Sequence, residues 1–169
     1  MGQETQETQE SQGGVAIAQL IDKELVLFDV KADSKEDLIR QMAACAQEHG
    51  YAVDGYAEDV IEREATYPTA LATQVMKVAV PHAMVQDHVL RPAIVVARLA
   101  HPVTFKEMGD GVNDVAVEMA FMLVAKGDKS HLKVLQKLIG MLADAEELRV
   151  LQAITDPDVM VHELIEHLA

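Results

Sequence analysis

Four aliphatic runs constrain the fold of this 169-residue chain more than any other feature. Each is short and rich in β-branched residues, which is typical of buried strands. The runs cover residues 25–30, 75–80, 93–99 and 115–124. The segment between the last two, "HPVTFKEMGDGVND", contains Asp110-Gly111 and is predicted to be a turn-rich connection.

Segments with helical periodicity lie among these runs and after them. Asp33 or Ser34 can cap a helix that ends near Gly50, and its apolar face includes Cys45. Four further helices are predicted, at residues 57–65, 131–144, 145–155 and 157–169. Strands and helices do not alternate strictly. We therefore expect an α/β (α+β) single domain, a mixed β-sheet flanked by α-helices, rather than a doubly wound parallel sheet.

Residues 1–14 differ in composition from the rest of the chain. They are Gln, Glu, Thr, Ser and Gly with no large apolar side chain after Met1, so a disordered low-complexity tail is expected there. Residues 15–169 should form one folded unit. The start of the chain does not match a secretory signal, no run is apolar enough for a membrane span, and Cys45 has no disulfide partner. These features favour a cytoplasmic protein without membrane insertion.

The formal net charge of −14 narrows the choice of partners. A nucleic-acid-binding protein would carry a basic face, so no nucleic-acid partner is expected. The acidity is compatible with a basic protein partner, although solubility explains it more simply.

Several classes of catalytic site have no motif in this sequence. Neither G-x-x-x-x-G-K nor G-x-G-x-x-G occurs, and G-x-S-x-G and H-E-x-x-H are also absent. His162 and His167 are five positions apart, about 140° around a helix, so they should not bind one ion. Both are interpreted as exposed polar residues of the last helix.

The remaining histidines have ordinary structural interpretations. His49 lies at a helix C-terminus, where the dipole favours a cation, and His88 and His101 are expected in solvated loops. A zinc site made from His82, His88 and His131 is conceivable, but the spacing is a weak signal.

His82, His131 and Arg63 also have structural interpretations. His82 follows Pro81, which ends the strand predicted at residues 75–80, and a histidine there is usually a hydrogen-bonded loop residue. His131 begins a helix whose packing is expected to involve Leu132. Arg63 lies among carboxylates and fits a surface ion pair. The residues alone do not decide between these structural interpretations and a functional role for the three side chains.

The segment "EREATYPTALATQVMKVAVPHA" resembles the phosphorylation segment of the fructose/mannitol-type (type 2) enzyme IIA domains of the bacterial phosphotransferase system. Arg63-Glu64 matches that family's Arg-Glu pair, and Pro81-His82 matches its phosphorylated histidine. Downstream, "RPAIVVARLAHPVTF" is similar to the family's strand and Pro-Val-x-Phe turn. His131-Leu132 is similar to its second histidine. The likeness covers residues 20–169, and "TYPTALAT" is most similar to the galactitol-specific branch.

This resemblance implies a phosphotransferase that carries a phosphoryl group on His82. The group would come from phospho-HPr and pass to a cysteine of a separate enzyme IIB, with a separate membrane enzyme IIC. Arg63 would contact the phosphoryl oxygens and His131 would donate a hydrogen bond to them. The active histidine would lie at a sheet edge open to partners. No metal, nucleotide or other cofactor would be required.

Some of these implications stay open. The loop before His82 is longer than in mannitol-type members, and Ala83 stands where many members have Gly, so the sugar or polyol is not fixed. A regulatory protein similar to the nitrogen-type IIA proteins is the main alternative. A non-catalytic interaction domain and a metal-binding protein are the others, and the oligomeric state is open.

Overall fold

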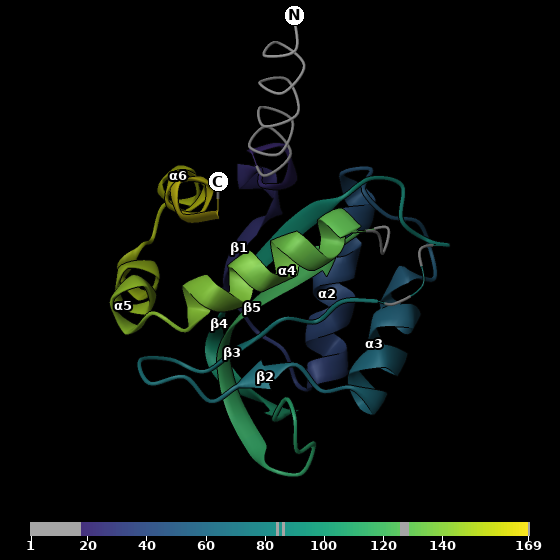
Figure 1. Cartoon of the computed structure of the whole chain (residues 1–169). Helices are drawn as coiled ribbons and strands as arrows, with labels where there is room; N and C mark the ends of the chain where they lie inside the picture. Colours follow the sequence, from purple (N-terminus) through teal and green to yellow (C-terminus); the bar gives the residue numbers. More distant parts are fainter. Residues whose placement is uncertain (1–17, 84, 86, 126–128, 169) are drawn as a thin grey trace, which may run out of the picture.

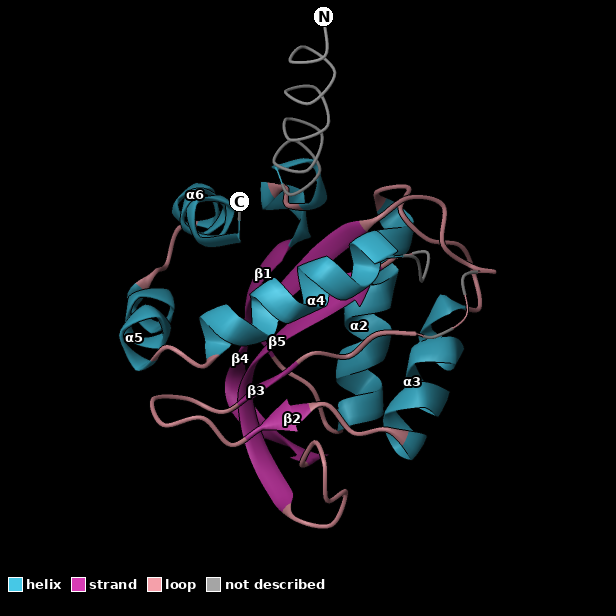
Figure 2. Cartoon of the chain, in the orientation of Figure 1, coloured by secondary structure: helices cyan, strands magenta, loops and turns pink. Residues whose placement is uncertain are grey.

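The sheet of this protein is mixed, as the sequence predicts. The computed structural model describes residues 18–83, 85, 87–125 and 129–168, so the predicted tail at residues 1–14 lies outside the described residues. The strands are β1 (Val26–Val30), β2 (Ala70–Leu71), β3 (Val78–Ala79), β4 (Ala93–Lys106) and β5 (Asp114–Val124). Their order across the sheet is β1-β4-β5-β3-β2 (Figures 1 and 2). β1 is parallel to β4 and β3 is parallel to β5, while β4–β5 and β2–β3 are antiparallel.

Helices cover both faces of the sheet. On one face lie α2 (Lys35–Glu48) and α3 (Tyr56–Thr66), and on the other lie α4 (Lys129–Leu142), α5 (Ala145–Ala153) and α6 (Pro157–Leu168) (Figure 1). A short 3₁₀ helix, η1 (Lys23–Leu25), precedes β1. None of the described helices has the length and apolar character that a membrane span requires.

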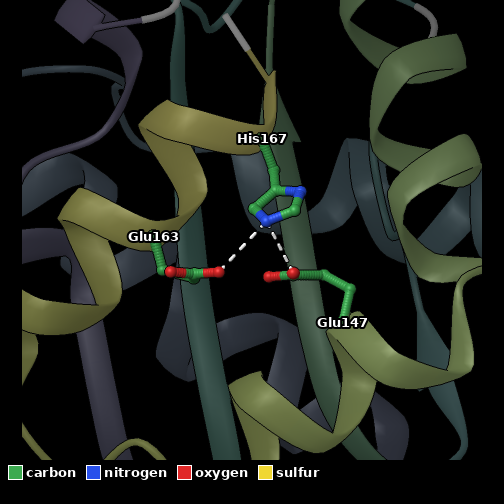
Figure 3. A group of neighbouring side chains, drawn as sticks. All are labelled: Glu147, Glu163 and His167. Carbon is green, nitrogen blue, oxygen red and sulfur yellow. Dashed lines mark ion pairs between the residues drawn. The ribbon is translucent and has the colours of Figure 1, made fainter.

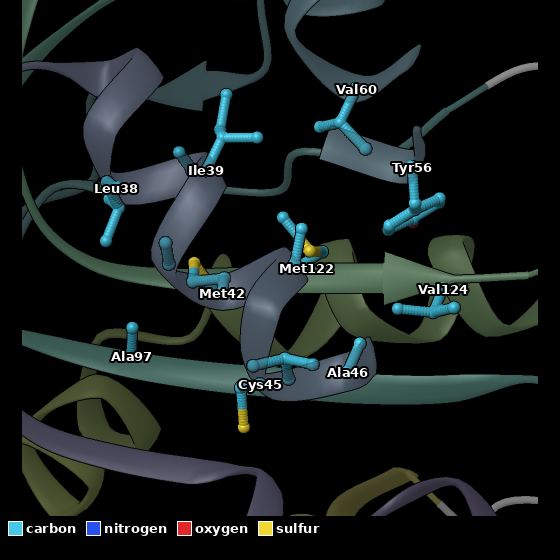
Figure 4. Close-up of a cluster of buried hydrophobic side chains, with 14 of the residues drawn as sticks. Leu38, Ile39, Met42, Cys45, Ala46, Tyr56, Val60, Ala97, Met122 and Val124 are labelled. Atoms are coloured by element: carbon cyan, nitrogen blue, oxygen red, sulfur yellow. The ribbon is translucent and has the colours of Figure 1, made fainter. Parts of the chain in front are cut away.

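Alternation along β4 builds two separate cores. Val95 and Ala97 pack in the cluster under α2 and α3, part of which is drawn in Figure 4. Ile94 and Val96 pack in the second cluster, under α4, α5 and α6. Successive side chains of a strand point to opposite faces, so both faces of this strand are buried and the run is continuously apolar.

Local sequence signals set the helix ends. The Ser34 hydroxyl caps α2 by accepting a hydrogen bond from the Asp37 backbone N–H at 3.1 Å, which decides between the two predicted caps. Asp144 caps α5 in the same way, and Asp156 accepts from the first turn of α6.

The strand boundaries differ from the predicted ones. β3 contains only Val78–Ala79, and β2, at Ala70–Leu71, lies outside the four predicted strands. β4 continues to Lys106, so His101 lies in an exposed part of a strand and not in a loop. Pro102 is accommodated because the β4–β5 register shifts between Arg98 and Val103.

Candidate functional site

His82 lies just beyond the end of β3. A parallel bridge pairs His82 with Leu123, and the Leu123 N–H donates to the Pro81 carbonyl at 3.1 Å, which holds this segment against the end of β5. The His82 residue is only 3 % exposed. The expectation of an active histidine open to partners is therefore wrong for this structure, because the ring is covered by its neighbours.

The hydrogen bond of the His82 ring fixes its tautomer. Nδ1 lies 2.8 Å from the carbonyl oxygen of Val80, and a carbonyl can only accept, so Nδ1 carries the proton. Nε2 then keeps its lone pair. Burial lowers the pKa of His82 to about 4, and the positive charges of Arg63 and His131 act in the same direction. The imidazole is thus neutral at any pH near 7 and has one nucleophilic nitrogen.

His131 is distant from His82 in the sequence, but its ring lies beside the His82 ring. The centroids of the two rings are 5.5 Å apart and the rings are tilted by 58°. His131 lies in the first turn of α4, on the face that carries the buried Leu138 and Leu142. Leu132 is exposed, so its expected role in packing is wrong: the helix begins with the histidine, and not the leucine, turned inward.

Arg63 comes from the last turns of α3 and is half-buried. Its Cζ atom lies 4.8 Å from the centroid of the Tyr67 ring. Its Nε and Nη1 atoms are buried and have no hydrogen-bond partner among the residues that the structure describes. A surface ion pair, the ordinary interpretation of Arg63, is therefore not what the structure shows. Its positive charge is near enough to His82 to contribute to the lowered pKa of that imidazole.

A chain of hydrogen bonds holds the strand that leads to His82. The buried Glu64 carboxylate accepts from the backbone N–H and the hydroxyl of Thr69, both at 2.7 Å. The same hydroxyl accepts from the Val80 N–H at 3.2 Å. Burial raises the pKa of Glu64. Sequence reasoning matched Glu64 to the family's Arg-Glu pair but gave it no role, and it did not identify Thr69.

The segment after His82 is held against α3 by His88. Its Nδ1 lies 2.6 Å from the Asp59 carboxylate. His88 lies in a turn and its side chain is 36 % exposed, as expected for a loop residue, but the contact with Asp59 was not predicted. The hydrogen bond with Asp59 raises its pKa. Gly55, with φ +102°, lies directly under this ring. His88 is engaged here, and within the described part of the chain no group of three potential metal ligands includes His82 or His131.

The assembled groups suit the transfer of an anionic group. A neutral nitrogen nucleophile, a second imidazole and a guanidinium with available donors are what a phosphoryl group needs when catalysis consists of positioning and charge stabilisation. Cys45 offers no alternative nucleophile, because burial raises the pKa of its thiol to about 11.

Comparison with known proteins identifies the family that this chain matches. The family described as "Phosphoenolpyruvate-dependent sugar phosphotransferase system, EIIA 2" matches residues 19–167. The galactitol-specific EIIA component of Escherichia coli K12 is 31 % identical over 114 residues, which are 68 % of this chain and 73 % of that protein.

Two solved structures share the fold. The crystal structure of IIA mannitol from Escherichia coli has a TM-score of 0.68 and 27 % identity, with 88 % of this chain and 99 % of that chain covered. Enzyme IIAMTL of Escherichia coli, in its complex with phosphorylated enzyme IIBMTL, has a TM-score of 0.69 and 26 % identity, with 86 % and 96 % covered.

Proposed function

The chain belongs to the EIIA type 2 family of the phosphoenolpyruvate-dependent sugar phosphotransferase system, and we propose that it carries the phosphoryl group on Nε2 of His82. The observation that supports this most strongly is the hydrogen bond from Nδ1 to the Val80 carbonyl, which leaves Nε2 as the nucleophile. Members of this family are components of the phosphotransferase system. The phosphoryl donor, the phosphoryl acceptor and the catalytic residues of this chain are what we propose.

In the first step, Nε2 attacks the phosphorus of the phosphohistidine of HPr. The new P–Nε2 bond forms while the P–N bond to HPr breaks, and the HPr imidazole leaves with the electron pair. In the second step, a thiolate of enzyme IIB attacks phosphorus and His82 leaves as the neutral imidazole, its proton still on Nδ1. The proton stays on Nδ1, which donates a hydrogen bond to the Val80 carbonyl throughout, so no base is needed for His82.

Arg63 and His131 stabilise the group in transit. The transition state is loose and its charge is spread over three oxygens. The Nε and Nη1 donors of Arg63 match those oxygens in geometry and charge, as lysine would not. His131, whose ring lies beside that of His82, donates a further hydrogen bond.

Transfer requires the ring of His82 to be uncovered. Its 3 % exposure leaves too little room for the phosphorus of a second protein. We expect the docking partner to displace side chains around it. A surface depression next to Arg63, lined also by Tyr67 and Val85, is where such a partner would approach.

The likeness to a galactitol-specific component supports galactitol or a similar polyol as the transported compound. The cytoplasmic location and the separate enzyme IIB are parts of the proposal. A protein that only reports metabolic state through phospho-His82 would share the first step but not the second.

The test is the complete relay. Purified protein is incubated with phosphoenolpyruvate, enzyme I and HPr, and then with a galactitol-type enzyme IIB, and intact mass is recorded at each stage. We expect one acid-labile phosphoryl group on the wild type, none on His82→Gln, and its loss when enzyme IIB is added. His101→Gln, in an exposed part of β4, is the matched control and should behave as wild type. No phosphoryl group on folded wild type, with HPr active, would contradict the proposal. Stable phosphorylation that no enzyme IIB discharges would favour the regulatory alternative.

A further inference from the structure

A second cluster of titratable side chains lies between α5 and α6. Nε2 of His167 is 2.7 Å from Oε2 of Glu147 and 3.1 Å from Oε1 of Glu163 (Figure 3). One potential ligand atom of each residue lies within 4.8 Å of the others. Glu163 and His167 are one turn apart on α6, and Glu147 reaches them from α5, so the group depends on tertiary packing.

Glu147 is the buried member of this cluster. It is 4 % exposed, and its Oε1 atom has no hydrogen-bond partner among the described residues. Its carboxyl group points at the other two side chains in Figure 3. A buried carboxylate beside a second one is relieved either by protonation or by a cation between the two groups.

The ring of His167 contacts both carboxyl groups. It accounts for Oε2 of Glu147 and for Glu163, but it leaves Oε1 of the buried carboxylate unpartnered. A dication at the centre of the three side chains would engage that oxygen and hold both carboxylates at once.

We propose that Glu147, Glu163 and His167 form a binding site for a divalent transition metal of the Zn²⁺ type, with a water molecule as the fourth ligand. Zinc takes imidazole nitrogen and carboxylate oxygen at roughly 2.0–2.2 Å, and three protein ligands with an open position are a common set. Ligand atoms in such a tetrahedron are about 3.3 Å apart. Nε2 of His167 therefore has to move away from Oε2 of Glu147, now at 2.7 Å, and only slightly from Oε1 of Glu163, now at 3.1 Å. Glu163 and His167 are 24 % and 42 % exposed, which gives them the freedom to do so.

The donor set also selects the kind of metal. One imidazole nitrogen favours Zn²⁺ over Mg²⁺ and Ca²⁺, which prefer oxygen ligands alone. The metal would cross-link α5 to α6. This site is separate from His82: in Figure 1, α5 and α6 lie at the left, whereas α3, which carries Arg63, lies at the right.

The experiment is a calorimetric titration of the chelator-treated full-length protein with zinc chloride, and separately with magnesium chloride. The variants are Glu163→Gln, His167→Gln and Glu147→Gln. The matched control is His162→Gln, which removes the other histidine of the same helix, one that is exposed and pairs with Glu166 at 3.5 Å. Circular dichroism verifies that each variant is folded. Absorption of the Co²⁺-loaded protein provides a second readout, because tetrahedral Co²⁺ has characteristic visible bands.

We expect one Zn²⁺ per chain, with affinity falling by roughly tenfold or more in Glu163→Gln and in His167→Gln and remaining unchanged in His162→Gln. Zn²⁺ should also raise the melting temperature of the wild type but not of these two variants. The proposal is overturned if no Zn²⁺ binds, if Mg²⁺ binds equally well, or if the two variants bind as wild type does. Loss of binding in His82→Gln alone would also overturn it. Because Glu163 is on the partly exposed side of the cluster, its variant keeps the test decisive even if Glu147→Gln does not fold.

Discussion

His82 has a fixed tautomer and a lowered pKa, and both depend on its burial. Its proton is fixed on Nδ1 by the Val80 carbonyl, and burial lowers its pKa to about 4. An exposed histidine would be partly protonated below pH ~6.5 and would lose its nucleophilic lone pair. His82 keeps that lone pair across the whole physiological range, at the cost of being covered.

The first prediction concerns this pKa. In an NMR titration of the imidazole resonances, the His82 signal should have its midpoint near pH 4, because burial and the nearby charges disfavour the imidazolium. His82→Gln assigns the signal. A midpoint at the ordinary value of ~6.5 would show that the ring is solvated in solution.

The second prediction concerns Arg63. Arg63→Gln should slow phosphorylation by phospho-HPr by roughly 10- to 100-fold, because it removes donors aimed at the transition-state oxygens. Arg63→Lys should recover only part of the rate, since an ammonium cannot replace a planar fork. Arg40→Gln, which removes an exposed arginine paired with Glu58 on the same face of the sheet, is the control. Equal rates in all three variants would remove Arg63 from the mechanism.

At the scale of the elements, the short strands β2 and β3 depend on side-chain hydrogen bonds. Two residues in each strand make few ladder bonds. Thr69 links α3, through Glu64, to the Val80 N–H just before His82. The position of His82 is therefore set by a buried carboxylate on another element.

Thr69→Val tests this link. It keeps the shape of the side chain but removes the hydroxyl, which leaves the buried Glu64 carboxylate and the Val80 N–H short of a partner. We expect a loss of about 1–3 kcal/mol in the free energy of unfolding, measured by urea denaturation. Thr66→Val is the control, because its hydroxyl donates only to the exposed Glu62 carbonyl. A loss no larger than in that control would show that the link contributes nothing.

The sequence predicted the elements that depend on local signals and missed those that do not. The caps at Ser34, Asp144 and Asp156 are local, and their helices begin as predicted. β4 was predicted to end at residue 99, with a turn-rich connection after it. A register shift, which no local pattern announces, carries the strand past Pro102.

For the whole molecule, the two-sided sheet brings together groups that are distant in sequence. The family pattern pointed to His82, His131 and Arg63, and the structure places the two histidine rings 5.5 Å apart. The sequence pattern did not predict that the His131 side chain turns inward, because the apolar Leu132 was expected to pack in the core. The cluster of Glu147, Glu163 and His167 was also missed, because only the packing of α5 on α6 creates it.

The free energy of unfolding of the whole protein should depend on pH. A histidine whose folded pKa is below its unfolded value of ~6.5 destabilises the fold as pH falls, because the unfolded chain then binds more protons. His82 should therefore reduce stability between pH ~6.5 and 4, by at most about 3 kcal/mol. Glu64 and Glu147, whose pKa values are raised, act in the opposite direction.

The contribution of His82 is isolated by comparing two proteins. Urea unfolding of wild type and His82→Gln from pH 7.5 to pH 4 should show the variant gaining stability relative to the wild type as pH falls, since both retain the two carboxyls. Parallel profiles would mean that His82 has the same pKa in the folded and unfolded states.

The most direct measurement for the whole account is ¹⁵N–³¹P NMR of the protein labelled in its histidines and phosphorylated through HPr. We predict a single phosphoryl group on Nε2 of His82, with Nδ1 still protonated and donating to the Val80 carbonyl. A phosphoryl group on Nδ1, on another histidine, or on none of them would contradict the account.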